Sequence, residues 1–196
     1  MLITIEGIDG AGKTTLATRL AERLGAVLLR EPGGVELSER IRTLVKDPAL
    51  SVHPRAEALL YAAARAQLVE ERIRPLLAGG ATVILDRFTD SSLAYQGAGR
   101  ALGVEDVRAI NGFATGGLRP DVTLLLALAP SVGRARLDDR GGERDRLERE
   151  GAGFFGLIAD AYEALARAEP ERFRVLDASR DADAVLEQAL AALPGT

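Results

Sequence analysis

The 196-residue sequence predicts an α/β fold in which five parallel strands form one sheet with helices on both faces. The first observation is an alternation of short, apolar, β-branched runs with segments that carry apolar residues at helical spacing. The second is a glycine-rich loop that joins the first apolar run to the first helical segment. The runs are continuously apolar, which is typical of strands covered on both faces of a parallel sheet. The length suits a single domain.

The first half of the chain supplies three of the five strands, at residues 2–6, 26–29 and 82–86. A helix over 16–24 should end at Gly25, a residue suited to a helix C-terminus. The loop 30–34, Arg-Glu-Pro-Gly-Gly, is followed by helical spacing over 35–45 and 54–77. We expect His53 to start the second of these helices, and Pro75 to bend or end it because proline has no N–H.

The second half supplies the remaining strands, at residues 122–128 and 173–176. Helical spacing covers the ranges 89–95, 104–114, 131–139, 154–168 and 181–193. A glycine-containing loop should follow the first of these ranges. Residues 140–146, Arg-Gly-Gly-Glu-Arg-Asp-Arg, are too charged and too glycine-rich for a core, so we expect a mobile surface loop there.

Composition excludes several classes of protein. The net charge of −4 argues against broad affinity for nucleic acid or an acidic membrane surface, which both require a basic face. The absence of cysteine excludes disulfides and thiolate catalysis. No apolar run is long enough for a membrane span, and Met1-Leu2 leads directly into the first strand. We therefore expect a cytoplasmic protein that contacts neither membrane nor nucleic acid.

The glycine-rich loop is predicted to bind a polyphosphate. Its spacing, Gly7-x4-Gly12-Lys13-Thr14, lets backbone N–H groups and a helix N-terminus point at phosphate oxygens. Lys13 would reach the β- and γ-phosphates, and Thr14 would hold Mg²⁺. A glycine-rich turn that binds nothing is disfavoured by the preceding strand and the following helix. The predicted loop residues are Gly7, Ile8, Asp9, Gly10, Ala11, Gly12, Lys13, Thr14 and Thr15.

Three features narrow the reaction class. A guanine-reading Asn-Lys-x-Asp motif is impossible because Asn111 is the only asparagine and no lysine follows it. A dinucleotide fold is disfavoured because the loop has no third glycine at the required offset. Asp86-Arg87 ends a buried strand, which would bring a carboxylate for Mg²⁺ and a guanidinium for phosphate to the mouth of the loop. A surface ion pair is the alternative for this dipeptide.

Five tracts in order resemble bacterial thymidylate kinases, which are P-loop nucleoside monophosphate kinases. They are residues 6–15, 30–34, 86–88, 91–97 and 119–121, and the resemblance covers nearly the whole chain. It implies a P-loop NTPase-type five-stranded parallel sheet in a single kinase domain, with an arginine-bearing lid over about residues 139–150. It further implies γ-phosphoryl transfer from ATP to thymidine monophosphate (dTMP) with Mg²⁺, a step in dTTP supply for DNA synthesis, and a homodimer.

The resemblance assigns roles on the donor side and at the reacting phosphate. Lys13 would cradle the donor phosphates, with Thr14 and Asp86 at Mg²⁺. Asp9 would meet the 3′-hydroxyl of the acceptor sugar. Arg87 would grip phosphate between donor and acceptor.

On the acceptor side, Arg42 would hold the monophosphate. Tyr61 would stack on thymine and Arg65 would bond its edge, four residues apart on one helix face. Ser92 would add a polar contact to the base, and Tyr95 would crowd the 2′ position of the sugar. Tyr61 as ordinary core, and Arg42 and Arg65 as solvated helix faces, are the alternatives.

Some members of the family carry an arginine inside the phosphate-binding loop, where this chain has Gly10 and Ala11. The missing charge should come from the lid, with Arg140 favoured over Arg144 and Arg146. Relatives also carry an aspartate near the strand end at Ala127, and its absence is unexplained.

Two other functions remain open at this stage. One is a kinase of another nucleoside monophosphate or of a nucleoside. The other is a regulatory or scaffold protein that binds ATP without acceptor chemistry.

Overall fold

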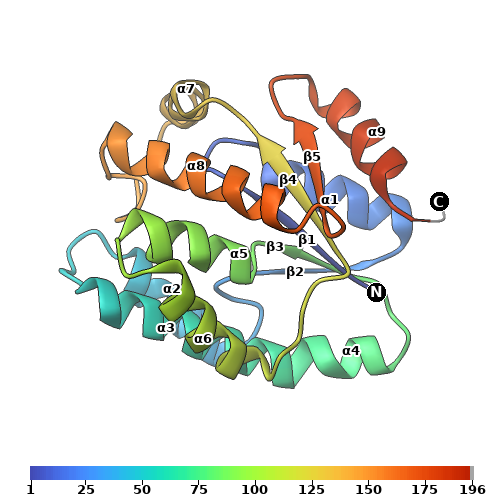
Figure 1. The fold of residues 1–196 in the computed structure, drawn as a ribbon, viewed down its shortest axis with the longest axis horizontal. Helices are drawn as coiled ribbons and strands as arrows, with labels where there is room; N and C mark the ends of the chain where they lie inside the picture. The colour runs from blue at the N-terminus through green and yellow to red at the C-terminus, as the bar shows by residue number, and fades with distance from the viewer. Residues whose placement is uncertain (195–196) are drawn as a thin grey trace.

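A computed structural model describes residues 1–194 and contains one five-stranded parallel sheet with helices on both faces, as predicted (Figure 1). The strand order is β2-β3-β1-β4-β5, with all four pairings parallel. β1, which leads into the glycine-rich loop, is therefore the central strand. The strands are β1 (Leu2–Gly7), β2 (Val27–Arg30), β3 (Val83–Asp86), β4 (Val122–Ala127) and β5 (Phe173–Asp177).

The helices form two layers around this sheet. One layer contains α1 (Lys13–Leu24) and α9 (Ala182–Ala192), which pack against each other. The remaining helices are α2 (Glu36–Lys46), α3 (Pro54–Leu68), α4 (Arg74–Ala78), α5 (Thr89–Ser92), α6 (Val104–Thr115), α7 (Pro130–Arg140) and α8 (Ala152–Ala168). Two π-helical segments, η1 (Val69–Ile73) and η2 (Leu93–Gly99), continue α3 and α5. α2, α3 and α6 lie together on one side of the molecule (Figure 1).

Alternation along β1 divides the core. Ile3 and Ile5 belong to a large apolar cluster that includes Leu16 and Leu20 of α1. Leu2 belongs to a second cluster with Leu85 and with residues of α3 and η1. Glu6 follows the Leu2 side of the strand, because side chains two apart share a face. The buried Glu6 carboxylate therefore lies near the C-terminal end of β1. Ligands of such folds bind at the edge of the sheet where the strands end.

Two local predictions are confirmed. Gly25 ends α1 in the left-handed conformation, with φ 60°. His53 is the N-cap of α3, and its Nδ1 accepts a hydrogen bond from the backbone N–H of Arg55 at 3.3 Å.

As expected for Pro75, the helix ends at Ala78, within the turn that contains the proline, and a π segment, Val69–Ile73, precedes that turn. The wider turn of the π segment accommodates Pro75, which has no N–H to donate to the carbonyl four positions earlier. The expected glycine-containing loop starts later than predicted: η2 runs on through Gly97 to Gly99, and a loop that contains Gly103 then leads to α6. Val104 approaches the Cβ position of Gly97 to 3.1 Å, so close packing against α6 explains a glycine inside a helix.

Candidate active site

The glycine-rich loop forms the predicted turn between β1 and α1. Gly10 and Gly12 adopt left-handed φ angles of 82° and 92°. α1 begins at Lys13, so its first-turn N–H groups lack intrahelical acceptors and are free to bind an anion. The Lys13 ammonium donates to the Ile8 carbonyl at 2.7 Å, and burial lowers the pKa of Lys13 to about 8. An incoming phosphate would add negative charge beside this buried cation, which lies 4.0 Å from the Asp9 carboxylate.

Gly10 has no room for a side chain. A Cβ at this position would lie 2.2 Å from the carbonyl oxygen of Gly133 in α7. Gly133 is equally close-packed, since its own Cβ position is 2.7 Å from the Asp9 carbonyl. Ala11 is buried. The arginine that some relatives carry within this loop is therefore excluded here by backbone contact with α7.

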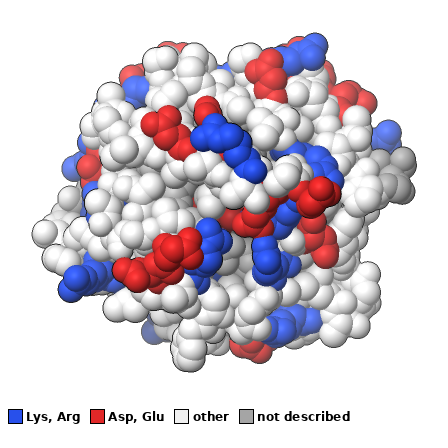
Figure 2. Space-filling view, viewed as in Figure 1, with Lys and Arg blue, Asp and Glu red and all other residues white. Residues whose placement is uncertain are grey.

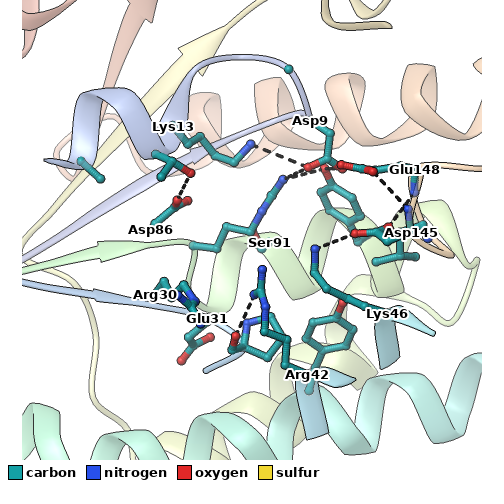
Figure 3. Close-up of a pocket in the computed structure, with 18 of the residues that line it drawn as sticks. Asp9, Lys13, Arg30, Glu31, Arg42, Lys46, Asp86, Ser91, Asp145 and Glu148 are labelled. Carbon is teal, nitrogen blue, oxygen red and sulfur yellow. Dashed lines mark hydrogen bonds and ion pairs between the residues drawn. The ribbon is translucent and has the colours of Figure 1, made fainter. Parts of the chain in front are cut away.

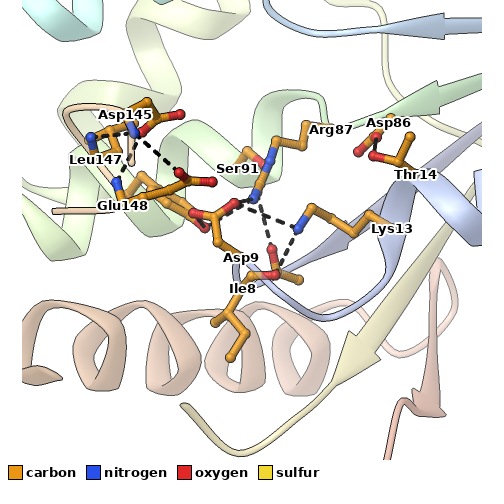
Figure 4. Close-up of polar contacts among 12 residues, drawn as sticks. Ile8, Asp9, Lys13, Thr14, Asp86, Arg87, Ser91, Asp145, Leu147 and Glu148 are labelled. Carbon is orange, nitrogen blue, oxygen red and sulfur yellow. Dashed lines mark hydrogen bonds and ion pairs between the residues drawn. The ribbon is translucent and has the colours of Figure 1, made fainter. Parts of the chain in front are cut away.

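Thr14 and Asp86 meet as predicted. The Thr14 hydroxyl donates to Asp86 Oδ2 at 2.6 Å, and both side chains line the cavity described below. In Figure 4 this pair lies to one side of Lys13, away from Asp9. Both groups offer the oxygen donors that Mg²⁺ prefers.

Arg87, Asp9 and Tyr95 form one hydrogen-bonded unit. Figure 4 shows Arg87 and Asp9 pointing toward each other. Arg87 has a left-handed backbone, with φ 73°, and its Nη2 lies 2.5 Å from Asp9 Oδ1. The Tyr95 hydroxyl donates to Asp9 Oδ2 at 2.9 Å. Burial disfavours the charged form of Asp9, but Arg87 and Lys13 outweigh it and lower its pKa to about 2. Asp9 is thus a charged acceptor beside the phosphate-binding loop.

Glu6 lies beneath this unit and was missed by sequence reasoning. Its carboxylate accepts hydrogen bonds from the Phe88 N–H at 2.7 Å, the Ser91 hydroxyl at 2.6 Å and the Tyr162 hydroxyl at 2.8 Å. Burial, with the nearby charge of Asp90, raises its pKa to about 7. The only sequence signal was a charged residue at the end of an apolar strand.

A cavity of about 860 Å³ joins these groups to the predicted acceptor residues. In Figure 3, Lys13 and Asp86 lie on one side of it, and Arg42 and Lys46 lie on the other. The predicted residues that line it are Asp9, Gly10, Gly12, Lys13, Thr14, Thr15, Arg42, Tyr61, Arg65, Asp86, Arg87, Ser92, Tyr95 and Arg140. The structure therefore brings together almost the whole predicted set, including residues far apart in the chain. Gly7, Ile8 and Ala11 belong to the loop but do not line the cavity.

Arg65 is a buried hub, not a solvated helix face. Its guanidinium donates to Glu31, Ser92, Asn111 and the Phe88 carbonyl. These acceptors use all five of its N–H groups. A direct bond from Arg65 to a ligand would require one of them to be released. Ser92 accepts from Arg65 at 2.9 Å, which leaves the Ser92 hydroxyl proton available for donation.

Gln96 lines the cavity and was missed as a site residue, although the sequence placed it in the tract 91–97. Its Nε2 donates to the buried carboxylate of Glu57 at 2.8 Å. The other end of the amide, Oε1, has no hydrogen-bond partner within residues 1–194 and is not enclosed by protein. The side chain therefore presents a hydrogen-bond acceptor to the cavity.

The lid arginines differ in their surroundings. Arg140 lines the cavity and pairs with Glu148 at 2.9 Å. Arg144 pairs with Asp138, and Arg146 pairs with the buried Glu57; neither lines the cavity. Arg136, one helical turn before Arg140, lines the cavity without an ion pair among the described residues. Sequence reasoning missed it because it lies on α7 before the charged loop.

Three residues of the segment 145–148 line the cavity, namely Asp145, Leu147 and Glu148. Lys46 of α2 pairs with Asp145 at 2.5 Å (Figure 3). On the face shown in Figure 2, acidic and basic side chains are interspersed, without a broad basic area.

A nucleotide-phosphate loop and an acceptor pocket in one cavity of a parallel α/β sheet define a P-loop kinase of a small phosphorylated substrate. The family model for thymidylate kinase matches residues 5–189. The chain belongs to the thymidylate kinase family. It is 50% identical to the thymidylate kinase of Deinococcus radiodurans, over 93% of this chain and 91% of that protein. It is 49% identical to the thymidylate kinase of Pseudomonas putida W619, over 100% of this chain and 97% of that protein.

The fold agrees with a solved structure. The crystal structure of thymidylate kinase from Ehrlichia chaffeensis superimposes with a TM-score of 0.79 and 29% identity, covering 97% of each chain.

Proposed function

We propose that this chain transfers the γ-phosphoryl group of ATP to dTMP, giving thymidine diphosphate, with Mg²⁺ held at Thr14 and Asp86. The observation that carries the proposal is the single cavity that contains both the phosphate-binding loop and the acceptor set, with Arg87 between them. Phosphoryl transfer depends mainly on positioning and on stabilising charge on the transferring group. A cavity that holds donor and acceptor together positions the two substrates, and the cationic side chains that line it stabilise the charge.

The donor side is the loop and the start of α1. Lys13 and the N–H groups of the first helical turn bind the β- and γ-phosphates. The Thr14 and Asp86 oxygens suit Mg²⁺, which when bound neutralises charge on the donor phosphates. Within residues 1–194 no group of three or more His, Cys, Asp or Glu side chains is arranged to hold a metal. Two protein oxygens are nevertheless usual for Mg²⁺, which keeps several waters.

The acceptor phosphate and sugar are assigned to Arg42, Arg87, Asp9 and Tyr95. Arg42 is half-buried in the cavity wall, where its Nη1 donates to the Pro32 carbonyl at 2.8 Å. The remaining N–H groups of Arg42 can bind the monophosphate. Asp9 is charged and is held in place by Arg87 and Tyr95. Its carboxylate accepts a hydrogen bond from the 3′-hydroxyl of the sugar. Tyr95 lies beside it and disfavours a 2′-hydroxyl.

The base is assigned to Tyr61, Ser92 and Gln96, with Arg65 behind them. Tyr61 supplies an aromatic face on the cavity wall. Thymine has an N3–H donor and an O4 acceptor on one edge. Gln96 Oε1 accepts a hydrogen bond from N3–H. The Ser92 hydroxyl, which Arg65 orients, donates a hydrogen bond to O4. Cytosine reverses both groups and would leave buried polar atoms unpaired.

Charge on the transferring group is stabilised by Arg87 and by arginines of α7. Arg140 is the sequence-based assignment, and Arg136 joins it because both line the cavity. We assign the lid to about residues 139–150, within a single kinase domain. Closure over the cavity would exclude water and limit hydrolysis of ATP.

A homodimer is proposed from an exposed apolar surface on neighbouring helices. Phe113 of α6 is 92% exposed and Leu59 of α3 is 57% exposed, and α3 packs on α6. Exposed apolar surface on neighbouring helices marks a candidate site of contact between proteins. None of the helices within residues 1–194 combines the length and the apolar character that crossing a bilayer demands. A cytoplasmic location remains a prediction.

The test is release of ADP from ATP in the presence of a panel of monophosphates: dTMP, dUMP, dCMP, UMP and CMP. We expect dTMP to stimulate turnover well above the others. Equal stimulation by the cytidine nucleotides would remove the assignment of the base. Tight ATP binding without acceptor-dependent turnover would instead indicate a regulatory protein.

A further inference from the structure

Glu57 is a buried carboxylate that the proposed function does not use. It lies on α3, is 0% exposed, and does not line the cavity. Three side chains converge on it: Gln96 at 2.8 Å, Arg100 at 3.2 Å and Arg146 at 2.6 Å. Taking a carboxylate out of water costs several kcal/mol unless it is paired. The two guanidinium groups offset that cost and stabilise its charge.

The charged state of Glu57 dictates how Gln96 is oriented. A carboxylate only accepts hydrogen bonds, whereas an amide can turn about its last torsion and offer either its NH₂ or its oxygen. Gln96 must therefore present Nε2 to Glu57, which directs Oε1 to the opposite side. Gln96 is 2% exposed and lines the cavity, so the opposite side is the one where the proposed function puts the acceptor base.

We propose that Glu57 is a positioning residue that fixes the Gln96 amide with its oxygen toward the base, and thereby sets the preference for pyrimidines with an imide N–H over cytosine. This inference rests on the proposed function, because it requires Gln96 to read the base edge. If the amide were free to turn, its NH₂ would face the base and would suit the N3 acceptor of cytosine. A residue that never touches the substrate thus determines which substrate is accepted.

The surroundings of Glu57 explain why its carboxylate is held in place. Arg100 also pairs with Glu150 at 2.5 Å and lies over the Phe154 ring at 4.8 Å. Arg146 is anchored by its backbone N–H to the Lys46 carbonyl and by Nε to the Val45 carbonyl. Both cations are therefore fixed from elements other than α3.

Glu57→Gln tests the inference, since the new amide can donate to Gln96 and permit the reversed orientation. We expect the ratio of kcat/KM for dTMP to that for dCMP to fall at least roughly tenfold, mainly through KM for dTMP. Glu57→Asp keeps an acceptor and should hold the ratio within about threefold of wild type. Glu150→Gln is the matched control: it removes a partner of Arg100 but does not contact Gln96, so the ratio should not change.

A double-mutant cycle separates positioning from a general loss of structure. In a Gln96→Ala background, Glu57→Gln should leave the ratio unaltered, because no amide remains to be oriented. An unchanged ratio in Glu57→Gln alone, or an equal fall in the Gln96→Ala background, would overturn the inference. Wild type that does not phosphorylate dTMP would instead overturn the proposed function.

If Glu57→Gln does not fold, neutron diffraction of the wild-type complex with dTMP decides the same point. We expect the deuterons of the Gln96 amide to face Glu57. Deuterons that face the base would contradict the inference.

Discussion

Glu6 ties three segments together at the carboxyl edge of the sheet. It binds the Phe88 N–H at the start of α5, the Ser91 hydroxyl, and Tyr162 of α8. Ser91 in turn accepts from Arg87 at 3.0 Å. A single buried carboxylate therefore supports Arg87, the arginine that we propose lies between the two substrates.

Glu6 gives stability a defined pH dependence. Its pKa rises from 4.5 to about 7 in the folded state, chiefly through burial, so the folded protein binds the proton more tightly than the unfolded chain. This contribution is fully present below pH 4.5 and is lost as pH rises through about 7. Relative to Glu6→Gln, wild type should lose about 3 kcal/mol of unfolding free energy across that window. Urea denaturation at pH 4 and pH 8, on either side of this window, measures the loss.

The control is Glu187→Gln, which removes an exposed glutamate of α9. Its unfolding free energy should follow wild type at both pH values. Parallel curves for wild type and Glu6→Gln would contradict the prediction.

The arginines of α7 are predicted to act in the transition state. Arg140→Ala and Arg136→Ala should each lower kcat by about 10²–10³-fold and change KM for dTMP little, because their charge is needed most when the phosphoryl group is in transfer. Steady-state kinetics with dTMP checks this. Arg144→Ala, whose partner is Asp138 and which does not line the cavity, should keep kcat within about twofold. An unaltered kcat in Arg140→Ala would leave Arg136 as the arginine that acts.

At the scale of elements, the glycine-rich loop and α7 are held together by backbone contact. Gly10 meets Gly133 where neither can carry a side chain, and Arg136 and Arg140 follow Gly133 on the same helix. The position of the phosphate-binding loop and that of the α7 arginines are thus coupled directly.

Gly10→Ala should therefore impair nucleotide binding as well as stability. The added methyl group would lie 2.2 Å from the Gly133 carbonyl, so the loop or α7 must shift. We expect KM for ATP to rise at least about tenfold, and the unfolding free energy to fall by more than the roughly 1 kcal/mol of a left-handed alanine. ATP titrations and thermal denaturation measure the two effects.

Gly25→Ala at the other end of α1 is the matched variant. Gly25 is also left-handed, but nothing lies within 4 Å of its Cβ position. It should cost about 1 kcal/mol and leave KM for ATP unchanged. Equal behaviour of the two variants would show that contact with α7 is unimportant.

At the scale of the whole molecule, the exposed surface of α3 and α6 is predicted to join two copies. Phe113→Glu should convert a dimer into a monomer, because it places a charge in the centre of the proposed contact. Light scattering after size-exclusion chromatography gives the mass directly. Leu157→Glu on α8, where leucine is 53% exposed, should not alter the mass. A wild-type monomer would refute the homodimer, and a dimeric Phe113→Glu would refute the surface.

By itself, the sequence determined the fold class, the glycine-rich loop and most of the cavity lining. The fold class, the loop and Asp86-Arg87 depend on local signals: continuous apolar runs, glycine spacing, and a charged pair at a strand end. The acceptor residues of the lining followed from the resemblance of five ordered tracts to a known family. The exclusion of cysteine chemistry followed from composition alone.

Only the tertiary structure decided which polar groups face the cavity and which hold others in place. The role that we propose for Gln96 depends on a hydrogen bond to Glu57, 39 positions away. Arg65 looked like a direct ligand, but its donors are satisfied by residues from three other segments. Position 10 must be glycine because the backbone of Gly133 leaves no room for a side chain. Hydrogen-bond polarity and steric exclusion arise between segments distant in the chain, and no local pattern encodes them.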